Sequence, residues 1–460
     1  MGTLRELFKP IDMTKGDPAK NIVMFAFPML LGNIAQQLYN TVDSIIVGRF
    51  VGDNALAAVG SAGPILNLML VLFMGISTGA SIMVSQYYGA RQRKDLSKTI
   101  CTCIVLTGVA SLFIMAVGSL LARPMLELLN TPAAIIDWCH GYLLIIFLGI
   151  AGGGYYNIMG GVLRGLGDSF SALIYLLIAT VTNIILDYTF VAYLNMGVYG
   201  VALATVIAQF LSGVLTMRKL SKMTDIFDLK KEYLKPEKKY TSRLIKLGLP
   251  SGLTQAIFSM SMIVVQSLTN SFGEMYIASN VIVMRVDGFV MLPAFSFGTA
   301  MTTFAGQNIG AQRMDRVDEG TKRGTLIALC TSAVLTLLIL VFGHQIMSIF
   351  TETEELIYTA NRCMRILAVG YIVMELTQCL SGVMRGAGDT VTPMWISLLS
   401  SVLVRVPLAY IMVGMTRTPE LPQGDFFMMS RSMLISWILG ALMTIFMYRR
   451  GKWRTKFDKA

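Results

Sequence analysis

The sequence has few charged residues. Asp, Glu, Lys and Arg together make up 14% of its 460 residues, whereas a soluble globular domain has about 25%. Hydrophobic residues make up 54% of the chain, and the mean hydropathy is +0.63. A soluble protein of this length needs more polar surface than these residues provide. The composition therefore predicts a multi-pass membrane protein.

Residues that bind metals or carry hydrolytic chemistry are also scarce. The chain has two histidines, His140 and His344, which lie far apart in the sequence. Its six cysteines lie within or at the ends of apolar runs, and none forms a Cys-x-x-Cys pair. We interpret the cysteines as small apolar residues and expect neither a disulfide framework nor a structural metal site. The lack of clustered His, Ser or metal ligands argues against a membrane enzyme.

Twelve apolar runs are long enough to cross a bilayer, which takes about 20 residues. We expect spans at 21–48, 56–82, 97–121, 134–157, 168–194, 197–219, 242–271, 277–304, 321–343, 356–381, 391–415 and 428–448. Lys and Arg cluster before the first span and after every second one. This alternation predicts a plasma (inner) membrane protein with both termini in the cytoplasm. It also accounts for the net charge of +11 without a nucleic-acid partner.

The sequence contains an internal repeat. Residues 160–169 (GGVLRGLGDS) and 381–390 (SGVMRGAGDT) share six of ten residues at an offset of 221, which also aligns Gln86 with Gln307. A duplicated hydrophobic chain is typical of transporters built from two lobes. We predict an all-α fold of twelve transmembrane helices in two six-helix lobes: an N-lobe (1–220), a cytoplasmic linker (221–241) and a C-lobe (242–460). Six spans per lobe imply a pseudo-two-fold axis along the membrane normal.

The first predicted span carries a carboxylate on a polar stripe. Asn33, Gln36, Asn40 and Asp43 are spaced by three and four residues, which places them on one helix face. An ionisable side chain inside a span is costly unless it is paired or solvated. Asp43 is therefore a functional candidate, and Gln36 and Asn40 are candidates for the lining of a cavity.

A second carboxylate in the same lobe is expected at a similar depth. Asp187 lies about as far into the fifth span as Asp43 lies into the first, at a rise of about 1.5 Å per residue. Asn183 shares the face of Asp187, and Thr205 reaches the same level from the sixth span. Two carboxylates, an amide and a hydroxyl suit a hard cation such as Na⁺, or a bound proton. The alternative is that these side chains form only local hydrogen bonds near span ends.

The second lobe has no matching acidic pair. The offset of 221 aligns Asp187 with Leu408, Asn183 with Val404 and Asp43 with Val264. Different charged residues, Arg285, Asp287, Glu375 and Arg405, lie within the C-lobe spans. We predict an ion pair between Asp287 and Arg405, with substrate contact by Asp287 as the alternative.

Further candidates are weaker. Asn157 and three of the 32 methionines, Met260, Met284 and Met291, are candidates for a cavity that accepts varied apolar ligands. The repeated turns offer four charged residues that either cross-link an inner gate or form plain solvated turns: Arg164, Asp168, Arg385 and Asp389.

Several motifs, taken together and in order, resemble those of the multidrug and toxin extrusion (MATE) family. They are Pro28 with Asp43, Val47-Gly48, Ala55–Val59, Val84–Ala90, Arg164–Asp168, Asn183-x-x-x-Asp187 and Gly306–Ala311. The resemblance extends over the whole chain. It implies export of amphipathic, often cationic drugs by antiport with Na⁺ or H⁺, with a cation site at Asp43, Asn183, Asp187 and Thr205. It also implies a bend near Pro28, where proline lacks the N–H that an unbroken helix needs.

The resemblance is to the prokaryotic branch whose cation site lies in the N-lobe, because Val404 and Leu408 depart from the branch with acidic C-lobe spans. We therefore expect a monomeric antiporter with Na⁺ or H⁺ as its coupling ion and no other cofactor. The main alternative is a flippase for a lipid-linked precursor, which needs a strongly basic cavity. A channel function would not explain why only one of the two duplicated lobes carries the carboxylates.

Overall fold

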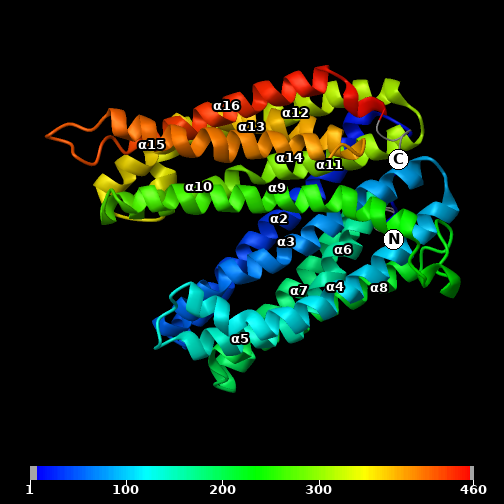
Figure 1. The fold of residues 1–460 in the computed structure, drawn as a ribbon, viewed down its shortest axis with the longest axis horizontal. Coiled ribbons are helices and arrows are strands. Elements are labelled where there is room, and N and C mark those ends of the chain that lie inside the picture. Colours follow the sequence, from blue (N-terminus) through cyan, green and yellow to red (C-terminus); the bar gives the residue numbers. More distant parts are fainter. Residues whose placement is uncertain (1–7, 456–460) are drawn as a thin grey trace. The chain divides into compact units, whose positions relative to one another are not determined.

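The protein is described by a computed structural model that covers residues 8–455, and all regular structure in that range is helical. The first repeat forms seven α-helices and one π-helical turn (Figure 1). They are α2 (Pro18–Phe50), α3 (Asp53–Gly89), α4 (Arg93–Leu128), α5 (Ile136–Leu148), α6 (Ile150–Leu166), α7 (Ser169–Tyr188), η1 (Thr189–Tyr193) and α8 (Gly197–Ser221).

The second repeat follows a short 3₁₀ turn, η2 (Lys231–Leu234). Its elements are α9 (Lys238–Asn270), α10 (Glu274–Val290), α11 (Leu292–Gly310), α12 (Met314–Ser348), α13 (Glu354–Gly386), α14 (Val391–Ser397), η3 (Leu398–Val404), α15 (Arg405–Met415) and α16 (Phe427–Arg449), followed by η4 (Lys452–Thr455). The segment η3 is a π-helix that joins α14 to α15 within one continuous run.

Eleven helices of the described chain are long and apolar enough to span a membrane, and the bent pair α5–α6 brings the number to twelve. The pair is bent by 53° around Gly149. Each of the twelve predicted spans has a counterpart, which confirms the all-α membrane fold class. The helices run beyond the predicted apolar segments because charged turns continue them; α4, for example, begins at Arg93 rather than at residue 97.

The chain divides into two compact units that differ from the predicted lobes at two places. Within the described residues, one unit contains Phe27–Gly252 and residues 8–12, and the other contains Met13–Ala26 and residues 253–455. The first helix of each repeat, α2 or α9, is therefore divided between units, and Pro28 and Pro250 lie beside the two division points. Sequence hydropathy does not reveal this exchange, because the spans themselves are continuous.

Polar contacts hold each exchanged segment in place. In the second unit, the Met13 N–H donates to Gln307 Oε1 at 2.9 Å. In the first unit, the Arg243 guanidinium donates to Gln86 Oε1 and to the Tyr87 hydroxyl, both at 2.8 Å. Gln86 and Gln307 are equivalent in the repeat, so the same glutamine secures an exchanged segment in both units.

The segment that follows α8 docks on the start of α4. The Arg93 guanidinium donates to Asp228 at 3.1 and 2.8 Å and to the carbonyl of Asp225 at 2.7 Å. The hydrogen bond from Arg93 holds the pKa of Asp228 below its usual value. Because this carboxylate is stabilised in its charged form, the attachment is present at neutral pH and weakens as the pH falls through that lowered pKa.

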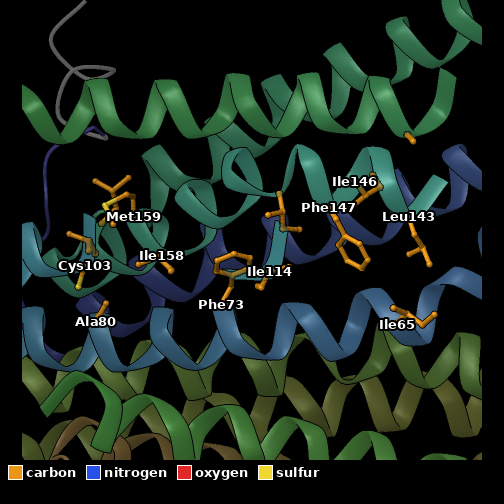
Figure 2. Close-up of a cluster of buried hydrophobic side chains, with 14 of the residues drawn as sticks. Ile65, Phe73, Ala80, Cys103, Ile114, Leu143, Ile146, Phe147, Ile158 and Met159 are labelled. Carbon is orange, nitrogen blue, oxygen red and sulfur yellow. The ribbon is translucent and has the colours of Figure 1, made fainter. Parts of the chain in front are cut away.

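The interior of the first unit is a continuous apolar core between α3, α4, α5 and α6 (Figure 2). Phe73, Ile114, Phe147 and Ile158 point into it from these four helices and are at most 1% exposed. This packing fixes the helices against which the polar residues of α2, α7 and α8 are placed.

Glycine allows α3 and α9 to approach closely within the first unit. A Cβ atom added at Gly79 meets the carbonyl oxygen of Leu244 at 2.8 Å, and one added at Gly75 meets that of Gly248 at 2.7 Å. Small residues at such crossings let helix backbones pack directly against each other. By contrast, a Cβ atom added at Gly60, on the same helix, has no neighbour within 4 Å.

We therefore expect Gly79→Ala and Gly60→Ala to change stability in opposite directions. Gly79→Ala forces α3 and α9 apart and lowers the Tm of the purified protein in detergent. Gly60→Ala leaves the Tm unchanged or raises it, since alanine is the better helix former by up to about 1 kcal/mol. Thermal unfolding followed by size-exclusion chromatography measures both; equal shifts for the two variants contradict the packing.

Candidate functional site

The two carboxyl groups predicted to share a depth meet in the first unit. Asp43, on α2, and Asp187, near the end of α7, have side-chain carboxyl groups that lie close enough to interact directly. Asp187 is completely buried, and Asp43 is partly buried. Each group also has a buried oxygen, Oδ1, without a hydrogen-bond partner. Two acidic side chains thus lie between helices, and one of the two carboxyl oxygens of each has no hydrogen-bond partner.

Asn183, Thr205 and Tyr39 complete the cluster. In the amide orientation that satisfies both of its polar atoms, Asn183 donates to Asp187 Oδ2 at 2.8 Å and accepts from the Thr205 N–H at 3.2 Å. The Thr205 hydroxyl lies 3.4 Å from that of Tyr39. Asn183 lies one turn before Asp187 on α7, so the helix itself aligns the amide with the carboxylate. The structure therefore brings together all four residues of the expected cation site.

A cavity opens beside this cluster. It has a volume of about 490 Å³ including its mouth, and Gln36, Tyr39, Asn157 and Asn183 are among its lining residues. Its described lining contains no Lys, Arg, Asp or Glu. Two of the sequence candidates, Gln36 and Asn157, thus line the cavity. Asn40 does not; it is exposed and lies 3.5 Å from the Gln36 amide.

The equivalent positions of the second unit carry Val264, Val404 and Leu408, which have no ionisable group. Asp287 and Arg405 instead lie on a second cavity, of about 570 Å³ including its mouth. The salt bridges within 4 Å among the described residues do not include this pair, so the predicted direct ion pair is not formed, although the two charges are close enough to interact. The positions of the two residues along their spans predicted a similar depth in the membrane, but they did not predict the direction in which each side chain points from its helix.

The methionine candidates separate in the structure. Met284 lines the second cavity. Met291 is buried in the core of the second unit, at 7% exposure, so packing accounts for it. Met260 is 64% exposed and is not among the residues that line this cavity, so its role in a binding cavity stays a prediction. Helical spacing alone does not distinguish these environments.

The repeated turns cap helices. Asp168 accepts from the Ser171 N–H at 2.9 Å and from its hydroxyl at 2.7 Å, while Asp389 accepts from the same groups of Thr392 at 3.3 and 2.7 Å. Both aspartates are at most 5% exposed, so the plain solvated turn is wrong. Burial raises the pKa of Asp168, which its bonds with Ser171 and the charge of Lys219 oppose. Asp168 is the N-cap residue of α7, and Asp389, one residue before the N-cap of α14, accepts from the first turn of that helix, so both copies of the motif stabilise the start of a helix.

The two arginines of these turns lie on the preceding helices. Arg164 donates to the Ser77 hydroxyl at 3.0 Å, which links α6 to α3 within the first unit. Arg385 lies in the last turn of α13 and is partly buried. A gating role for either residue stays a prediction.

Sequence reasoning missed two tyrosines. Tyr39 lies four residues before Asp43, and this spacing alone places its hydroxyl on the functional face of α2. Tyr371, on α13, lies close enough to interact with Asp287, and its hydroxyl donates to the sulfur of Met364 at 3.4 Å. No signal in the sequence connects Tyr371 with Asp287, because the two residues lie on helices that are far apart in the chain.

Comparison with known proteins identifies relatives along the whole chain. The family model MatE matches twice, over residues 28–189 and 250–411, in agreement with the internal repeat. The chain is 32% identical to the probable multidrug resistance protein YoeA of Bacillus subtilis over 405 residues, 86% of this chain and 88% of that protein. It is 28% identical to the probable multidrug resistance protein YpnP of the same organism over 449 residues, 97% and 98% of the two chains.

Solved structures share the fold. A crystal structure of MATE in complex with MaL6 superimposes with a TM-score of 0.90 at 22% identity, covering 98% of this chain and 100% of that one.

The buried acid pair leads to a prediction about stability. Asp187→Asn keeps the size of the side chain and removes an acid whose Oδ1 has no partner. A buried ionisable group is costly, so we expect the Tm in detergent to rise. The exposed Asp137, converted to Asn, is the control and leaves the Tm unchanged. A large fall in the Tm of Asp187→Asn means instead that the acid is part of the structural framework.

Proposed function

Since the chain belongs to the MatE family, we propose that it is a multidrug efflux transporter that works as a secondary active antiporter. It exports amphipathic, often cationic compounds in exchange for Na⁺ or H⁺ bound at Asp43 and Asp187. Asn183 and Thr205 complete the ion site, and Tyr39 positions Thr205.

The close approach of the two carboxyl groups between α2 and α7 is the observation that carries this proposal. Two ionised carboxylates repel each other and have no proton to share. The contact therefore needs a proton on one of them or a cation between them. Either ion reduces the repulsion between the two carboxyl groups. When the ion leaves, two like charges remain, and their repulsion favours a different arrangement of α2 and α7.

Antiport requires that the favoured conformation depends on whether the ion is bound. A coupling ion drives transport only if its affinity differs between the conformations that alternate during the cycle. The position of Asp43 supports a role in that change, since Pro28 interrupts the hydrogen bonding of the same helix. In this account a shift of α2 moves one carboxyl group relative to the other and alters the ion affinity.

The cavity beside the acid pair is the proposed place for a cationic drug. Its lining offers amide and hydroxyl groups from Gln36, Asn157 and Tyr39 together with apolar surface. The flippase alternative needs basic groups to hold a pyrophosphate, and the described lining has none. This favours drug export over transport of a lipid-linked precursor.

The distribution of basic loops supports a plasma-membrane location with both termini in the cytoplasm. Each unit has its own core, and we propose that the monomer transports.

Loss of the ion site abolishes export in this account. We expect Asp43→Asn to reduce the drug resistance of cells expressing the protein to the level of an empty vector. The protein is still produced and inserted, because the substitution preserves side-chain volume. Whole-cell efflux of a cationic dye, normalised to the amount of protein in the membrane, measures this.

Asp137→Asn removes an exposed carboxylate from the same unit and serves as the matched control, with full efflux expected. Undiminished efflux by Asp43→Asn contradicts the proposed coupling.

A further inference from the structure

The segment that connects α8 to α9 is attached to the first two turns of α4. The Asp228 N–H donates to the Ser97 hydroxyl at 2.9 Å, and Glu237, near the other end of the segment, forms an ion pair with Lys98. Phe227 is 1% exposed and belongs to the apolar core of the first unit. Because these contacts are spread along the segment, the side chains that point away from α4 are presented in a fixed arrangement.

The side chains that these contacts leave exposed are basic or apolar. Leu229 and Leu234 are each 41% exposed, one before the turn η2 and one at its end. Four lysines are exposed and form no ion pair with a described carboxylate: Lys230, Lys231, Lys235 and Lys238. Glu232 is the one acidic side chain of residues 229–238 outside the ion pairs of the described chain. We call the two leucines and four lysines the basic linker face.

The basic linker face lies next to the point where α4 enters the bilayer. Residues 99–122 of α4 contain no charged side chain, and Lys98 is the last charged residue before this run. The segment contacts α4 at Ser97 and Lys98, directly before the apolar stretch. A run of this length fills the hydrocarbon core of a bilayer. The segment therefore belongs at the level of the lipid headgroups.

The first repeat lacks an equivalent surface. The offset of 221 aligns Leu234 with Met13 and Lys235 with Thr14. Met13 is completely buried, and its N–H donates to Gln307. The scaffold of the repeat thus uses this position for packing in one copy, whereas the other copy exposes a leucine among lysines. Helix packing does not account for the exposed leucine.

The combination of lysine and leucine at this level fits an anionic bilayer surface. Ammonium groups attract the phosphates of anionic lipids, and apolar side chains beside them insert at the boundary between headgroups and acyl chains. A soluble acidic protein pairs with the lysines but gives no reason for two exposed leucines at the depth of the headgroups. Charge and depth therefore both favour lipid.

We propose that the basic linker face docks on anionic phospholipids of the surrounding membrane. The four lysines bind the headgroup phosphates, and Leu229 and Leu234 insert at the upper ends of the acyl chains. The lipids next to this segment are then richer in anionic headgroups than the bulk bilayer. This interaction is separate from the acid pair at Asp43 and Asp187.

A tryptophan placed on the basic linker face tests the proposal. The full-length variant Leu234→Trp is reconstituted in vesicles of equal amounts of phosphatidylglycerol and phosphatidylcholine, in which only one of the two lipids carries brominated acyl chains. Bromine quenches tryptophan on contact, and the signal of the parent protein, which has four tryptophans, is subtracted. We expect brominated phosphatidylglycerol to quench the added tryptophan about twofold more strongly than brominated phosphatidylcholine, because lysines enrich anionic lipid around them.

Charge removal assigns the preference to the linker. Adding Lys230→Gln, Lys231→Gln and Lys235→Gln to Leu234→Trp makes the two brominated lipids quench equally. The matched control removes three exposed basic residues near the end of the described chain, through Arg449→Gln, Arg450→Gln and Lys452→Gln, and keeps the preference. Each preference is a ratio measured on one protein, so differences in yield do not imitate it.

Leu229→Trp is a second reporter, used in the same way if Leu234→Trp does not fold. Equal quenching by the two lipids overturns the proposal, as does a preference that survives the loss of the three linker lysines. An added tryptophan that neither lipid quenches shows that the surface faces water, where a soluble partner is the remaining reading, and also overturns it. The measurement needs no ion gradient, so its outcome is independent of the proposed antiport.

Discussion

The structure depends on the cost of placing two carboxyl groups side by side inside a helical bundle. Asp43 and Asp187 lie close together between helices, and Asn183, Thr205 and Tyr39 are the polar side chains of the same cluster. Such a pair needs a proton or a cation. In the proposed mechanism this requirement couples the ion to the conformation, because an ion that binds or leaves changes which arrangement of α2 and α7 is favourable.

Because the chain is duplicated, the second repeat can be compared with the first, which carries the acid pair. The two repeats use the same capped turns at Asp168 and Asp389 and the same glutamine anchors at Gln86 and Gln307. On that common scaffold the first unit has an acid pair and an amide-lined cavity, whereas the second has thioethers and two separated charges. The residues shared by the repeats therefore account for the common scaffold, and the proposed functional residues are among those that differ between the repeats.

Much of this organisation follows from the sequence, because hydropathy, charge alternation and repetition are one-dimensional signals. They predict the twelve spans and the meeting of Asp43 with Asp187, since helix rise converts position into depth. They do not predict rotation about a helix axis or contacts between distant helices. For that reason they do not predict that Asp287 and Arg405 interact without a direct ion pair, or that Tyr371 lies close to Asp287. The exchange of the α2 and α9 segments between units leaves hydropathy unchanged and was not predicted.

Transport by the purified protein in liposomes tests the central claim most directly. Efflux of a cationic dye is measured under a Na⁺ gradient alone and under a pH gradient alone, for the wild-type protein and for Asp187→Asn. The account predicts that at least one gradient drives efflux by the wild-type protein and that neither drives efflux by the variant. Gradient-driven efflux of equal rate in Asp187→Asn would contradict the assignment of coupling to the buried acid pair.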